Sequence, residues 1–367
     1  MHLMKSLNSQ MIDNLTFFQS LLAFLIILTP IVFVHELGHF IFARLFGVEV
    51  EKFSIGFGPV LFFFHDKNKT KWQIAAIPIG GFVKMKGELS VAGTNLNNCE
   101  IGSFQLANPF QRLLIVFGGP LFNFLLTIVL IAGIYLFFGK VEISNTLNGV
   151  VEGSPADNAG IIADDKIISI NGIKVKNFEE IRQIIFESPN KFLELEISRK
   201  DKSFFINLKT EAEWSEDLKI YVGKLGIISN KGVLKKFGFS ESIYNSFLDT
   251  IFITQSMIRG VIKLFSGNAQ KGEIGGPVRI AELSGQALVS GFIPLIFFGA
   301  LISLNLALVN LLPIPALDGG HIVLYIIEII LGKPLPIHVQ NILMRGGVSI
   351  LLALMILITI YDVARFF

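Results

Sequence analysis

Polar and apolar positions along the chain are arranged in four long apolar runs separated by mixed segments. The runs cover 17–46, 113–138, a stretch beginning at Phe292, and 347–361. A helix needs about 20 mostly apolar residues to cross a bilayer. The pattern therefore predicts a polytopic α-helical membrane protein with about four transmembrane helices. The last of these needs flanking residues to span.

The same pattern predicts how the chain is divided. The expected segments are an N-terminal segment with the first transmembrane helix (1–46), a β-hairpin or re-entrant loop (47–112), a second transmembrane helix (113–138), an extramembrane domain (147–228), a linker with an amphipathic helix (229–291), a third transmembrane region (292–331), and a short loop with the fourth transmembrane helix (332–367).

Polarity alternates with a period of two inside the 47–112 loop. In KFSIGFGPVLFFFHDKNKTKWQIAAIPIGGFVKMKGE, two alternating stretches flank the polar turn DKNKT. This pattern is typical of a β-hairpin or small sheet. From these residues alone, it could be an ordinary amphipathic hairpin packed on the helices.

About 150 mostly polar residues lie between the second and third runs, enough for one extramembrane domain. Short β-rich pieces, Gly-Ser-Pro and Asn-Gly turns, and a helix near Phe178–Ser188 predict a small α+β module. The following stretch, Ser240–Gly267, has helical periodicity, but polar residues interrupt it. We expect an interfacial amphipathic helix there rather than a span.

Composition supports the membrane interpretation. The chain is 52% hydrophobic and 16% charged, whereas soluble domains carry about 25% charged residues. The net charge of +2 is too small to argue for nucleic-acid binding. The single cysteine, Cys99, excludes an intrachain disulfide and a multi-cysteine metal site, so we interpret it as a bystander.

Positive charge near the spans predicts an orientation, because basic residues favour the cytoplasmic side. The 47–112 loop is expected to be cytoplasmic and the 140–291 domain outside. Lys333 and Arg345, before the last span, agree with this. The basic residues of the loop are Lys52, Lys67, Lys69, Lys71, Lys84, Lys86 and Arg112.

Ionisable residues inside the first apolar run raise the possibility of a metal site. The run contains VHELGH, which puts His35 and His39 four residues apart, on one face of a helix, with Glu36 beside them. Zinc held by two such imidazoles lowers the pKa of its bound water, and the glutamate can take the proton. The competing interpretation, two core histidines, is weaker because they would lack partners in lipid.

A catalytic zinc usually has a third protein ligand. The pattern HExxHxxGxxH is absent after His39, but NLALVNLLPIPALDGGHI, in the third transmembrane region, places Asp318 within apolar sequence. The two prolines break the helix there, and a broken backbone at membrane depth must be buried in protein or line a cavity. Asp318 is therefore the favoured third ligand and His321 the runner-up, while a plain loop aspartate outside the span stays possible.

HELGH together with N-x-x-P-x-P-x-L-D-G resembles the site-2 protease family of intramembrane zinc peptidases, in its bacterial RseP-type group. The resemblance implies a triad of His35, His39 and Asp318 around one zinc ion per chain, with Glu36 as the catalytic residue. It also makes Asn310, Pro313 and Pro315 contributors to substrate positioning.

Other segments show the same resemblance. IPIGGFVKMKGE resembles the family's membrane-associated β-loop, which implies that its strand pairs with substrate through Gly80, Gly81, Phe82, Val83, Lys84 and Met85. GGPLFNF, Gly118–Phe124, is similar to a family Gly-Pro-x-x-Asn stretch, interpreted as scaffold near the site rather than as catalytic.

The α+β module also has a resemblance of its own. GSPADNAGI followed by DKIISING resembles a PDZ domain, with Asp164 where the family commonly has glycine. The chain has room for one PDZ domain, whereas well-known RseP-type enzymes have two.

The implied function is cleavage of transmembrane segments in single-pass proteins already cut by another protease, such as anti-sigma factors or remnant signal peptides. The expected location is the bacterial cytoplasmic (inner) membrane, with the PDZ domain periplasmic and the active site toward the cytoplasm. The bilayer is the expected partner, and nucleic acid is not. A transporter is one alternative, but it predicts an internal repeat that the 292–361 half does not supply. A catalytically inactive PDZ scaffold is another, and the intact Glu36 argues against it.

Overall fold

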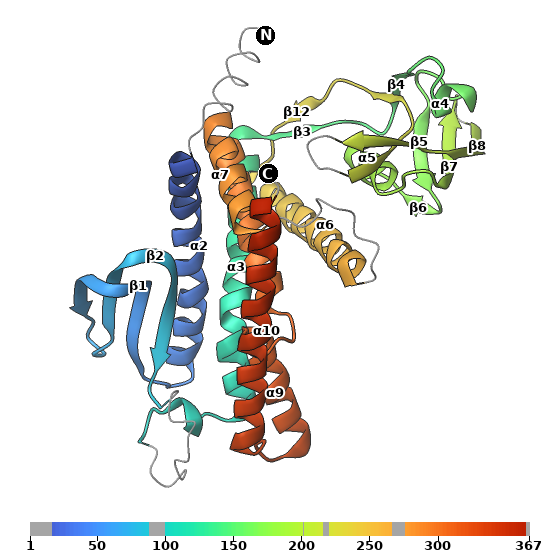
Figure 1. Ribbon diagram of the computed structural model, residues 1–367. Coiled ribbons are helices and arrows are strands. Elements are labelled where there is room, and N and C mark those ends of the chain that lie inside the picture. The colour runs from blue at the N-terminus through green and yellow to red at the C-terminus, as the bar shows by residue number, and fades with distance from the viewer. Residues whose placement is uncertain (1–16, 88–99, 201, 216–219, 266–275, 365–367) are drawn as a thin grey trace. The chain divides into compact units, whose positions relative to one another are not determined.

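The computed structural model describes residues 17–87, 100–200, 202–215, 220–265 and 276–364, so Cys99 lies outside the described residues. The chain forms two compact units (Figure 1). The first contains Met1–Ile134, Ser240–Ile258 and Gly275–Phe367, and the second contains Tyr135–Phe239 and Arg259–Ile274.

Long helices dominate the first unit. They are α2 (Phe17–Leu45), most of α3 (Pro109–Phe138), most of α6 (Phe239–Phe265), α7 (Pro277–Ser290), α8 (Phe292–Asn310), α9 (Asp318–Leu331) and α10 (Ile337–Ala364), with a short 3-10 helix, η2 (Phe104–Leu106), before α3.

Within the described residues, four helices are long and apolar enough to cross a membrane: Phe18–Leu45, Pro109–Phe138, Phe292–Asn310 and His338–Ile360. They coincide with the four predicted runs. The structure extends the last run at both ends, which supplies the flanking residues that it needed. Helix α6, predicted to be interfacial, is not among the candidate spans.

The predicted hairpin is present as β1 (Val50–His65) and β2 (Lys71–Met85), which pair antiparallel beside α2 (Figure 1). The strands bend, so that Lys52 pairs with Lys84 on one side and with Lys71 on the other. The end of β2 therefore forms one edge of the sheet. Phe53 stacks on Trp72 with ring centroids 4.3 Å apart, and both rings contact Phe40, which fastens the hairpin to α2.

The second unit is an α+β module. Its elements are β3 (Lys140–Glu142), β4 (Leu147–Val150), α4 (Pro155–Asn158), β5 (Lys166–Ile170), β6 (Ile173–Lys174), α5 (Phe178–Phe186), β7 (Phe192–Arg199), β8 (Lys202–Lys209), β9 (Glu211–Ser215), β10 (Ile220–Lys224), β11 (Ile227–Ser229) and β12 (Val233–Lys235).

The largest sheet of this unit has the strand order β6-β5-β7-β8, and β4–β11, β9–β10 and β3–β12 form two-stranded sheets. Helix α5 lies within the predicted 178–188 helix, and its Ile181 is fully buried in the core with Ile167 and Leu195. Asp164 has a φ of 66°, a left-handed conformation that aspartate adopts more readily than most residues other than glycine.

Candidate metal centre

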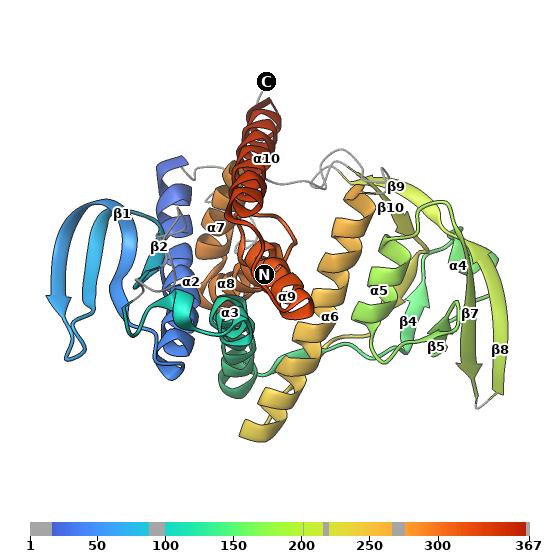
Figure 2. The ribbon, with the colours of Figure 1, turned by 90° about the horizontal axis from the view of Figure 1, so that it is seen from below.

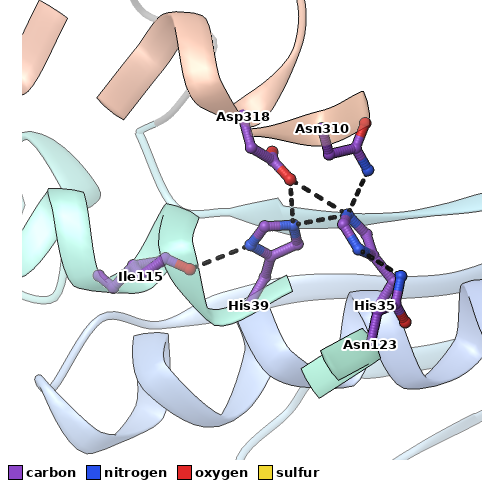
Figure 3. Close-up of polar contacts among 6 residues, drawn as sticks. All are labelled: His35, His39, Ile115, Asn123, Asn310 and Asp318. Atoms are coloured by element: carbon purple, nitrogen blue, oxygen red, sulfur yellow. Dashed lines mark hydrogen bonds and ion pairs between the residues drawn. The ribbon is translucent and has the colours of Figure 1, made fainter. Parts of the chain in front are cut away.

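Helix α2 carries the two histidines of the first motif. The four-residue spacing stacks His35 and His39 on one face, with their Nε2 atoms 3.3 Å apart and the rings in edge contact. The two residues are only 7% and 9% exposed. In Figure 3, this pair lies opposite Asp318 and Asn310.

The break between α8 and α9 brings an aspartate to the histidines. Asp318 is the first residue of α9, after a non-helical connection that contains Pro313 and Pro315. The path is tight, because a Cβ on Gly319 would lie 2.2 Å from the carbonyl oxygen of Leu312. Glycine is therefore required directly after the aspartate, where the sequence has two.

Helix α10 helps to hold this connection. A Cβ on Gly347 would lie 1.6 Å from the carbonyl oxygen of Pro315, so the two backbones are in direct contact. Pro315 is thus fixed by packing, whereas Pro313 is exposed. The part of these prolines in substrate positioning stays a prediction.

The donor atoms of the three residues converge on one point (Figure 3). Asp318 Oδ2 lies 3.2 Å from His35 Nε2 and 3.6 Å from His39 Nε2. Ligand atoms at about 2.0–2.1 Å from a tetrahedral zinc ion are about 3.3 Å from one another. The Oδ2 atom is also buried without a hydrogen-bond partner among the protein donors. Both observations fit a zinc ion held by this triad.

Asp318 and not His321 belongs to this group. In the part of the chain that the structure describes, His35, His39 and Asp318 are the one cluster of histidine, cysteine or acidic side chains close enough to share a metal. The His321 ring instead stacks on Tyr325, with centroids 6.3 Å apart. The geometry therefore favours the predicted third ligand over the runner-up.

The second ring nitrogen of each histidine contacts helix α3. His39 Nδ1 lies 3.0 Å from the carbonyl oxygen of Ile115, which can only accept a hydrogen bond. His39 Nδ1 therefore carries the proton, and Nε2 is left with its lone pair directed at the site. This is the usual arrangement of a metal-binding histidine. No side-chain signal could have revealed Ile115, because the contact uses its backbone.

Asn123 has the corresponding position beside His35. Its Nδ2 lies 3.2 Å from His35 Nδ1, while its Oδ1 is buried without a partner. Exchanging the amide O and N by a half-turn would satisfy Oδ1 with the His35 Nδ1 proton and give both histidines the same tautomer. The Asn123 backbone oxygen accepts hydrogen bonds from Thr127 and Ser303, both at 2.9 Å, which anchors the residue.

Two further predicted residues lie at the site. Asn310, the last residue of α8, places Nδ2 3.3 Å from His35 Nε2. Glu36 is half-buried, and a Cβ on Gly81 would lie 3.2 Å from its Cγ, so β2 runs directly past the glutamate. Val83 and Met85 are only 9% and 5% exposed and belong to the core. A substrate could therefore meet these two residues only through the main chain.

Comparison with known proteins gives a family match and several similar relatives. The family description "Peptidase family M50" matches residues 23–354. A relative from Rickettsia conorii, whose name classes it as a zinc metalloprotease, is 37% identical over 95% of this chain and 99% of its own. Similarly named relatives from Campylobacter jejuni and Rhizobium meliloti are 34% and 31% identical, each over 94% of this chain and over 93% and 96% of their own.

The chain therefore belongs to peptidase family M50, the site-2 protease family, whose members are zinc metalloproteases of the membrane. The predicted family and the predicted zinc cofactor are confirmed. The PDZ domain of an SdrC-like protein from Listeria monocytogenes is also similar, at 19% identity and a TM-score of 0.20, over 24% of this chain and 88% of that one. At that score, the PDZ interpretation of the second unit continues to depend on its sequence.

Proposed function

We propose that this metalloprotease is an intramembrane endopeptidase that hydrolyses peptide bonds within or near transmembrane segments, with His35, His39 and Asp318 holding one zinc ion. The observation that carries the proposal is the convergence of these three donors beside α3, with His35 and His39 on α2, a helix long and apolar enough to span a bilayer. Ionisable groups at that depth are costly and are retained for function.

The residues around the triad have distinct roles in the proposed reaction. A bound zinc ion supplies Lewis acidity and lowers the pKa of a coordinated water to about 7. Glu36, one position after a ligand and half-buried, takes the proton of the attacking water and returns it to the leaving amine. The Asn310 amide, 3.3 Å from His35 Nε2, is placed to donate to the developing oxyanion.

Hydrolysis requires the substrate helix to be unwound, because a helix uses its carbonyls in internal hydrogen bonds. The Gly81–Met85 segment of β2 pairs with β1 as an outer strand of the hairpin and passes beside Glu36. An unwound substrate added to such an edge would be held by main-chain hydrogen bonds. The scissile bond would then lie near the general base.

Proline substitution along β2 tests this mode of binding. In an edge strand the N–H groups point alternately toward the partner strand and outward. The outward N–H groups therefore belong to one of two pairs, Phe82 with Lys84 or Val83 with Met85. Proline at the outward pair should lower cleavage about two- to tenfold per lost hydrogen bond, while zinc content and thermal stability are kept. Proline at the other pair breaks bonds to β1 and lowers stability.

Alanine at each of these positions is the matched control, and at Phe82 and Lys84 it removes a side chain that is not part of the core. Helix-destabilising residues in the substrate should partly rescue the outward proline variants. If proline lowers cleavage equally at all four positions, or only where zinc is also lost, the hairpin has a structural role and does not bind substrate.

We further propose that the substrates are single-pass membrane proteins already shortened by another protease, in the bacterial cytoplasmic membrane. Basic residues in the 47–112 loop support a cytoplasmic position for that loop and for the nearby site, with the second unit on the opposite side. The resemblance of that unit to a PDZ domain supports a part in selecting substrates.

Metal analysis of two variants tests the proposed site. Asp318→Asn should lower bound zinc and abolish chelator-sensitive cleavage of a membrane-inserted substrate, because it removes a charged ligand. His321→Ala should keep one zinc per chain, since its ring stacks on Tyr325 outside the donor group. Zinc retained by the first variant and lost by the second would make His321 the ligand.

A further inference from the structure

A second polar cluster lies between α3 and α9, and the reaction described above does not use it. Arg112, near the start of α3, donates from Nη2 to Glu328 Oε1 on α9 at 2.6 Å. The two side chains are only 17% and 10% exposed. Burying an ion pair has a large desolvation cost, and removing one partner leaves an uncompensated charge. The pair therefore constrains how the two helices can pack.

The Arg112 side chain is fixed at more than one point. Its Nε donates to the carbonyl oxygen of Ala107 at 3.1 Å, and its guanidinium lies 5.0 Å from the centre of the Tyr325 ring. Tyr325 also contacts the buried Phe104 ring edge to face, at 6.4 Å. The segment from η2 to the start of α3 thus contacts α9 at both Tyr325 and Glu328.

Tyr325 and Glu328 lie on the same face of α9 as the proposed metal ligand Asp318. Asp318, His321, Tyr325 and Glu328 follow one another at intervals of three or four residues, which lie on one side of a helix. Asp318 and Glu328 are separated by about 15 Å along the axis. Figure 2 shows α9 running beside α3. A contact that sets the rotation of α9 at one end therefore sets the direction of the Asp318 carboxylate at the other.

Asp318 depends on such a constraint because it begins its helix. The connection before it packs closely against Gly319 and α10, but it is non-helical and includes Ala316 at a φ of 109°, so no continuous helix sets the rotation of α9 from that side. Functional groups need to be held within about 0.5 Å of their working geometry. We propose that Arg112, Glu328 and Tyr325 form a clamp that positions Asp318 against His35 and His39. The proposal rests on Asp318 being a zinc ligand, as in the proposed function.

The test measures zinc affinity by chelator competition on the full-length purified protein, with Asp318 intact and with Asp318→Asn. In the first background, Glu328→Gln should lower zinc affinity about tenfold, the lower end of the effect expected for groups that orient metal ligands. With Asp318→Asn, the same substitution should change affinity no further, because the clamp has no carboxylate left to position.

Glu282→Gln is the matched control, since it breaks an ion pair within another helix, α7, between Arg279 and Glu282 at 3.1 Å. It should leave zinc affinity unchanged in both backgrounds. If Glu328→Gln lowers zinc affinity equally in both backgrounds, the substitution destabilises the protein generally and the clamp is overturned. Unchanged zinc affinity with Asp318 present would also overturn it.

Two further outcomes are decisive. If Glu328→Gln does not fold, Tyr325→Leu is the substitute variant, because it removes the ring that contacts the Arg112 guanidinium. It should lower zinc affinity about two- to fivefold, the size of a cation–π contact, and only when Asp318 is present. No loss in that variant overturns the clamp. Wild-type affinity in the Asp318→Asn protein alone would instead overturn the ligand assignment of the proposed function, and the clamp with it.

Discussion

Glu36→Gln should lower cleavage about 10²- to 10⁴-fold while the protein keeps its zinc. The amide has nearly the shape of the carboxylate but cannot accept the proton of the attacking water. Glu36 lies outside the donor group of His35, His39 and Asp318, so the metal should stay bound. The measurement is single-turnover cleavage of a membrane-inserted substrate, with zinc determined on the same sample.

His35→Ala gives the comparison that separates the two roles. It should lose both zinc and cleavage, because its Nε2 is one of the three converging donors. Turnover near the wild-type rate in Glu36→Gln would exclude Glu36 as the base. Loss of zinc in that variant would mean that the glutamate shapes the metal site instead.

The features that the sequence predicted correctly depend on short-range regularities. The helical period alone places His35 and His39 on one face, and the alternation around DKNKT alone gives the hairpin, since both patterns repeat within a few residues. The prolines before Asp318 likewise predicted a broken helix, because the restriction that proline places on the backbone is local. The family resemblance then joined the two distant motifs.

Features that depend on packing between distant segments were not predictable. The Arg112–Glu328 ion pair joins positions 216 residues apart, and neither residue is unusual in its own segment. Asn123 was interpreted as scaffold, and only the structure shows its amide beside His35. Val83 and Met85 were predicted to pair with substrate as part of a strand, which stays a prediction. That their side chains belong to the core was not predictable, because the packing of β2 decides which face is covered.

The close crossing of α2 and α3 is another such feature. A Cβ on Gly38 would lie 2.1 Å from the carbonyl oxygen of Gly118. The helices therefore meet backbone to backbone, and this brings α3 within reach of both histidines. Small residues allow such an approach in membrane helices.

Gly119→Ala should therefore lower zinc affinity by about 100-fold, the upper end of the effect of displacing ligand-orienting groups. The added methyl would lie 2.4 Å from His39 Nε2 and 2.8 Å from His35 Cε1. Neither ring can move away without losing its contact to Ile115 or Asn123. The matched control is Gly133→Ala on the same helix, where nothing lies within 4 Å of the added atom. That variant should keep wild-type zinc affinity, because alanine also favours the helix. Equal zinc affinity in the two variants, measured by chelator competition, would show that the histidines do not need the space that Gly119 leaves.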